Sequence, residues 1–159
     1  MLPFWRLDPP FRFAVYIAFA VLSASGAAWL AADRMKESSE EEIWQESAAW
    51  LIMLHGGTAM LTLMLLGALV PVHIGRAWRA RKNRATGIVM AACNAVLIVT
   101  AFGLYYLASE TLRPWASDIH IAFGLSLPVL LLVHVKTGRK PSAPRVPRRQ
   151  PGSQAPPRS

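Results

Sequence analysis

The sequence predicts an all-α integral membrane protein, a four-helix bundle that crosses the bilayer four times. Three observations support this prediction. First, 53% of the 159 residues are hydrophobic. Second, four long segments contain no Asp, Glu, Lys or Arg, and they cover residues 13–32, 47–75, 85–109 and 119–135. Third, the lysines and arginines are concentrated in alternate connections between these segments.

The four charge-free segments contain 20, 29, 25 and 17 residues, and a helix needs about 17–25 apolar residues to span a bilayer. The first segment is too long for the apolar part of a cleaved signal peptide, about 7–15 residues, so we interpret it as a membrane anchor. The second is longer than a span requires and must tilt, bend or protrude. Pro71 is a natural place for a bend. The fourth can begin at residue 115, because Pro114 suits the first turn of a helix.

The distribution of positive charge predicts the orientation of the chain. With the N-terminus in the cytoplasm, 14 of the 17 lysines and arginines fall on the cytoplasmic side, as the positive-inside rule requires. Only Arg34, Lys36 and Arg113 fall outside. Of the nine acidic residues only Asp8 is inside, so the outer side is expected to be acidic.

The bundle is expected to form one domain, residues 1–140, with both termini in the cytoplasm. Residues 141–159 are rich in Pro, Ser and Arg, a composition that predicts a disordered basic tail. The pI near 10.6 then reflects topology and contact with anionic membrane lipid, and we expect no nucleic-acid partner.

The four histidines all lie in the second and fourth spans. His55 and His73 are 18 residues apart, which is five full helical turns and returns to the same face. His120 and His134 are 14 residues apart, about 40° from the same face. Because these two spans run in the same direction, His55 and His120 share the outer half of the bilayer, and the other two histidines share the inner half.

Two histidine pairs that face each other across a bundle suit haem. A six-coordinate haem iron needs two axial ligands, because the porphyrin supplies four equatorial nitrogens. The sequence therefore predicts an outer haem held by His55 and His120 and an inner haem held by His73 and His134. The only cysteine is Cys93 and no Cys-x-x-Cys-His motif occurs, so both haems should be b-type, without covalent attachment.

The alternative is a haem-free membrane transporter or structural subunit that uses histidine. A single intramembrane histidine is more often an interhelical hydrogen-bonding residue than a metal ligand. However, the four charge-free segments contain no Asp or Glu, and cation or proton pathways normally rely on such groups. The paired arrangement therefore favours haem over transport.

The placement of His55, His73, His120 and His134 resembles that of the membrane di-haem cytochrome b superfamily. This superfamily includes small bacterial four-helix cytochromes b and the haem-bearing subunits of formate dehydrogenase and hydrogenase. The resemblance covers about residues 11–139. The family usually spaces its paired ligands as His120 and His134 are spaced here, so the 18-residue step between His55 and His73 is a departure that concerns the inner pair.

The resemblance implies transmembrane electron transfer in the bacterial inner membrane, with lipid quinone as one partner. The other partner is expected to be a periplasmic redox protein or an oxidoreductase subunit. An acidic outer side should attract a cationic protein and repel superoxide, which makes superoxide oxidation, or another quinone-coupled oxidoreductase activity, the second interpretation. The sequence has no nucleotide-binding fingerprint and no iron–sulfur cysteines, so no catalytic residue is assigned.

Three arginines are candidates to hold the haem propionates, which are anionic and favour arginine near the membrane interface. Arg76 and Arg139 follow the two inner histidines, and Arg113 precedes the outer His120. The positive-inside rule explains Arg76 and Arg139 equally well. Arg113 goes against that rule, so it is the most informative of the three.

Overall fold

The computed structural model describes residues 8–39, 41–79 and 83–138, and this part of the chain is helical with short connections and no strand. The long helices are α1 (Pro9–Ser38), α2 (Glu42–Leu69), α4 (Arg84–Tyr106) and α5 (Leu112–Gly138). A π-helical turn (Val70–Ile74) and the short helix α3 (Gly75–Arg79) continue from α2. The predicted tail, residues 141–159, lies outside the described residues.

Within the described residues, all four long helices are long and apolar enough to cross a membrane. This confirms the all-α fold with four candidate spans. The helices extend beyond the charge-free segments, since α1 continues past residue 32 and α2 begins before residue 47. Likewise α5 begins at Leu112, where the Leu112 N–H donates to Ser109 Oγ at 3.3 Å. A charge-free segment marks the part of a helix suited to hydrocarbon, and its polar ends can continue as helix into water.

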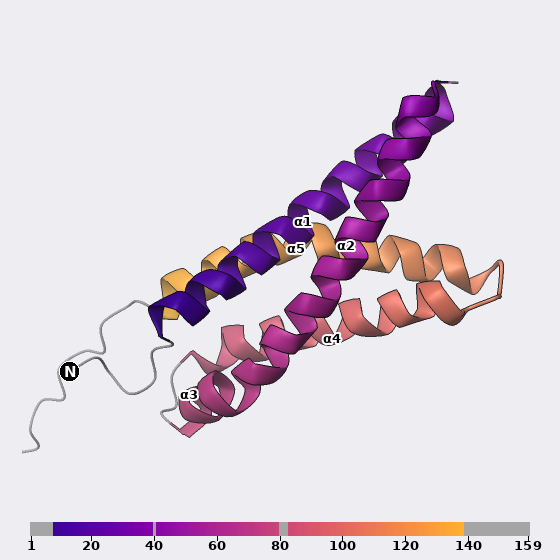
Figure 1. The fold of residues 1–159 in the computed structure, drawn as a ribbon. Helices are drawn as coiled ribbons and strands as arrows, with labels where there is room; N and C mark the ends of the chain where they lie inside the picture. Colours follow the sequence, from indigo (N-terminus) through magenta and orange to yellow (C-terminus); the bar gives the residue numbers. More distant parts are fainter. Residues whose placement is uncertain (1–7, 40, 80–82, 139–159) are drawn as a thin grey trace, which may run out of the picture.

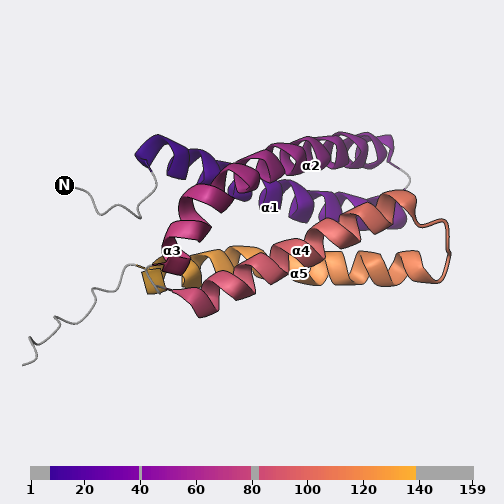
Figure 2. The same ribbon diagram turned by 90° about the horizontal axis from the view of Figure 1, so that it is seen from below.

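The helices form two antiparallel hairpins. Helix α1 packs against α2 and α4 packs against α5, and α1 also contacts α5. Figure 2 shows the hairpins as two layers, with both hairpin turns at one end and α3 at the other. Figure 1 shows α2 crossing α4 and α5 obliquely. The second and fourth spans, α2 and α5, therefore run in the same general direction but at an angle.

The chain bends where α2 ends. Pro71 lies at the start of the π-helical turn, and the Gly75 N–H closes this turn on the Val70 carbonyl. Proline has no N–H to donate and disrupts α-helical hydrogen bonding, and a π-turn accommodates one more residue than an α-helical turn. The bend directs the chain into α3 (Figure 2).

A small apolar core lies between the two hairpins. Its buried members are Val15 and Phe19 of α1, Leu69 of α2, Cys93 of α4 and Leu127 of α5. Each helix of the bundle therefore contributes at least one side chain to the same cluster. Because Leu127 is seven residues from both His120 and His134, the core lies between the two histidine levels.

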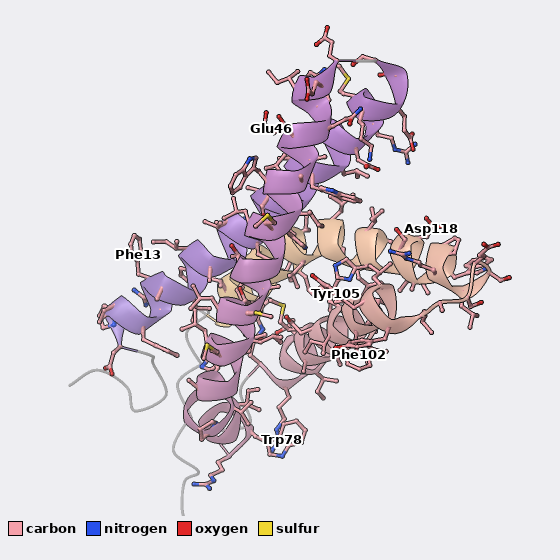
Figure 3. All side chains as sticks on the ribbon, turned by 45° about the vertical axis from the view of Figure 1, so that its right-hand side comes forward. Phe13, Glu46, Trp78, Phe102, Tyr105 and Asp118 are labelled. Atoms are coloured by element: carbon pink, nitrogen blue, oxygen red, sulfur yellow. The ribbon has the colours of Figure 1, made fainter. Side chains whose placement is uncertain are left out.

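The outer surface of the bundle is apolar. Met64 of α2 is 75% exposed, Val99 of α4 is 70% exposed, and Phe13 projects from α1 away from the other helices (Figure 3). Apolar surface on this scale would favour association in water but can contact lipid in a membrane. Glu46 and Asp118 lie toward the hairpin turns, and Trp78 lies at the opposite end (Figure 3). The arrangement supports a multi-pass membrane protein surrounded by lipid.

Candidate functional site

The first histidine pair joins α2 to α5. The ring centroids of His55 and His120 are 6.3 Å apart, and the ring planes are 84° apart. Both residues are half-buried. This pair lies toward the hairpin turns, because His120 is in the first third of α5.

The second pair joins the π-helical turn to α5. The ring centroids of His73 and His134 are 6.2 Å apart, with ring planes 77° apart. The structure therefore brings together the same two pairs that the sequence indicates, despite the unequal spacing within α2 and α5. Two features accommodate the longer step: α2 crosses α5 obliquely (Figure 1), and the π-helical turn changes the direction of the chain before His73.

A hydrogen bond from α1 orients the ring of His55. Its Nδ1 lies 3.0 Å from the Leu22 carbonyl oxygen, and a carbonyl can only accept, so Nδ1 carries the proton. The Ser25 hydroxyl also lies near this nitrogen, at 3.3 Å, and donates to the same carbonyl at 3.1 Å. A Cβ atom on Gly26 would lie 2.8 Å from His55 Cε1. Only glycine therefore leaves room for the ring here.

A threonine of α4 orients the ring of His120. The Thr100 hydroxyl lies 2.9 Å from His120 Nδ1 and 2.8 Å from the carbonyl oxygen of Val96. Because the hydroxyl has one hydrogen and the carbonyl needs it, the oxygen of Thr100 is left to accept from Nδ1–H. The proton of His120 is thus also assigned to Nδ1.

The same arrangement recurs at the other end of α4. The Thr86 hydroxyl lies 3.1 Å from His134 Nδ1 and donates to the Asn83 carbonyl at 3.3 Å. Asn83 has a left-handed backbone, with φ of 55°, and its side-chain amide donates to the His134 carbonyl at 3.0 Å. The start of α4 therefore holds both the backbone and the ring of His134.

His73 differs from the other three histidines. Its Nδ1 is buried and has no hydrogen-bond partner among the described residues. The two levels are consequently not equivalent: both rings of the pair nearer the hairpin turns have an acceptor at Nδ1, whereas only His134 has one in the other pair.

Each pair offers two nitrogen donors and no more. Across the described ranges, no three side chains of His, Cys, Asp or Glu come together to hold a metal ion. A structural zinc site needs four protein ligands and a catalytic one needs three. With Nδ1 protonated, a neutral imidazole keeps its lone pair on Nε2, so each level presents two imidazoles that suit a cofactor with its own equatorial ligands.

The predicted propionate-binding arginines are only partly accessible to description. Arg113 is exposed at the start of α5, two turns before His120. Arg76 belongs to α3, but its side chain lies outside the described residues, as does Arg139. The structure therefore brings none of the three into a described contact with a histidine.

Sequence reasoning missed the residues that orient the rings: Leu22, Ser25, Thr86 and Thr100. One signal was present. Thr86 and Thr100 are 14 residues apart, the same step as between His120 and His134, and helices packed side by side over that length can pair at both levels. The Leu22 carbonyl has no such signal, because any residue supplies a backbone acceptor.

Comparison of the chain with family profiles, with curated proteins and with solved structures finds no match. The site is therefore interpreted from its own geometry.

Proposed function

We propose that the chain is a b-type di-haem cytochrome that transfers electrons across the bacterial inner membrane. One haem would lie at each histidine level, ligated by His55 and His120 at one level and by His73 and His134 at the other. The carrying observation is the separation of the paired rings, 6.3 and 6.2 Å between centroids.

This separation fits two imidazoles on opposite sides of one metal ion. A histidine nitrogen lies about 2.0–2.1 Å from a bound transition metal. The centroid of a five-membered ring with bonds near 1.33 Å lies about 1.1 Å from each ring atom. Two ligands in line would therefore have centroids about 6.2–6.4 Å apart. Rings in van der Waals contact over an apolar core could pack more closely.

The protonation of the rings also fits ligation. Metal-bound histidines generally donate their other N–H to a carbonyl, hydroxyl or carboxylate, which fixes the tautomer and the ring orientation. His55, His120 and His134 have such an acceptor at Nδ1. Three hydrogen bonds from three separate places in the bundle thus leave the same nitrogen, Nε2, available.

The haem irons would supply the one-electron chemistry, and the protein would supply ligands, orientation and an apolar surrounding. The histidines of α2 and α5 fix the two levels, which are about 21 Å apart along α5. The buried cluster around Phe19, Cys93 and Leu127 excludes water between them. Arg76, Arg113 and Arg139 are the candidates to neutralise the propionates.

The proposed orientation places both termini and α3 in the cytoplasm and the acidic hairpin turns in the periplasm. Lipid quinone is the proposed partner within the membrane. A basic periplasmic redox protein, or an oxidoreductase subunit, is the proposed partner at the acidic end, since Glu41, Glu42 and Glu46 are exposed there. Opposite charge would favour their encounter.

The test is the haem content of the full-length protein, purified in detergent from haem-replete cells. We expect a reduced-minus-oxidised spectrum of b type and about two haems per chain, all extractable with acidified acetone. A colourless preparation that is folded, with a helical circular dichroism spectrum, would overturn the proposal. Haem that resists extraction would contradict b-type binding.

A further inference from the structure

Helix α4 presents a repeat that matches the one on α5. Thr86, Cys93 and Thr100 follow each other at steps of seven residues, as do His120, Leu127 and His134. The two threonines pair with the two histidines at 3.1 and 2.9 Å. Between them, Cys93 and Leu127 are buried in the same core cluster.

The threonines do more than satisfy their own helix. A threonine in a helix commonly donates to the carbonyl three or four residues earlier, and both residues do so here. This bond uses the hydroxyl hydrogen and leaves the oxygen as an acceptor that faces Nδ1–H of a histidine. Thr62 of α2 is a natural comparison, because it is also buried and donates to the Thr58 carbonyl at 2.8 Å, with no described bond to a histidine.

We propose that Thr100 and Thr86 are positioning residues, each setting the tautomer of one histidine and lowering the reduction potential of the haem at its own level. The inference rests on the proposed haem function. An Nδ1–H that donates a hydrogen bond makes the imidazole a stronger ligand. A stronger donor stabilises the ferric iron more than the ferrous iron, and hydrogen bonding around the metal is one of the protein's means of setting its potential.

The two threonines should not have equal weight. At the His55 level, loss of Thr100 leaves one ring still oriented by the Leu22 carbonyl. At the His73 level, loss of Thr86 leaves no Nδ1 acceptor, because His73 has none among the described residues. Thr86 is therefore the more critical of the two for keeping its haem.

The experiment is redox potentiometry of the full-length protein in detergent, with T100V, T86V and the matched control T62V. Valine keeps the shape of threonine but removes the acceptor. We expect T100V to raise the potential of the His55–His120 haem only, and T86V that of the His73–His134 haem only. A lost hydrogen bond of ordinary strength corresponds to about a tenfold change in the reduction equilibrium, about 59 mV for one electron. Variants H55A and H73A, each keeping one haem, assign the levels.

The conservative variants T100S and T86S keep the hydroxyl and should restore wild-type potentials. If T86V loses its haem, retention of that haem in T86S supports the proposal, and its loss in both contradicts it. Unchanged potentials in T100V and T86V, or equal shifts in T62V, would also overturn it. These outcomes differ from failure of the haem proposal, in which the wild-type protein itself contains no haem.

Discussion

The rings of His73 and His134 lie 6.2 Å apart, although they occupy different kinds of helix. His134 belongs to the regular helix α5, whereas His73 lies in a five-residue π-helical turn that contains Pro71. The step of 18 residues from His55 is thus matched to a step of 14 on α5. The pairing at this level depends on an irregular backbone as well as on helix crossing.

Replacing Pro71 should therefore disturb one level and spare the other. In P71A the backbone regains an N–H and can return to α-helical hydrogen bonding, which would rotate His73 away from His134. We expect reduced occupancy of the His73–His134 haem, with the other haem unchanged. Quantitative haem analysis and potentiometry measure this. The control is P114A, in the first turn of α5, where proline costs no hydrogen bond; an equal loss in that variant would contradict the explanation.

Removal of ligands should follow the pairs that the structure defines. H55A and H120A should each eliminate the same haem, and H73A and H134A the other, so each variant should keep about half of the wild-type haem. Exogenous imidazole can replace a missing ligand but cannot repair a misfolded helix. Its addition should restore the lost spectrum. Two variants from one pair that affect different haems would show that the pairing is wrong.

Gly26 should be intolerant of even a methyl group. A Cβ there would lie 2.8 Å from His55 Cε1, so G26A should displace the ring from the Leu22 carbonyl at a cost of about 1–3 kcal/mol of overpacking. We expect a lower thermal unfolding temperature and less haem at the His55 level. G87A is the matched control, because a Cβ on Gly87 would lie 3.9 Å from His134 Cε1, an ordinary contact. Similar losses in both variants would exclude steric displacement as the cause.

The sequence was sufficient for the spans and for the histidine pairs, because hydrocarbon thickness limits helix length and helical periodicity places residues on faces. It did not predict that α1 and α2 continue almost to a direct turn, since Asp33 and Lys36 can remain helical in water as an ion pair, 2.7 Å apart. Nor did it predict the π-helical turn or the Leu22 acceptor. These depend on how helices cross, which a single sequence does not encode locally.

The acidic hairpin turn should control the rate at which charged redox reagents reach the haem at the His55 level. Glu41, Glu42 and Glu46 are exposed, and the nearby Lys36 is already paired with Asp33. Replacing the three glutamates with glutamine should slow electron exchange with the cation hexaammineruthenium and speed exchange with the anion hexacyanoferrate. Added salt should reduce both differences, because the Debye length is about 8 Å at physiological ionic strength.

Stopped-flow absorbance of the haem measures these rates. The control is Q45N in the same segment, which changes no charge and should leave both rates as in the wild type. Opposite responses of the cation and the anion distinguish electrostatic steering from a general loss of access, because blocked access would slow both reagents together. Rates that are indifferent to charge and salt would mean that the acidic segment has no part in guiding a periplasmic partner.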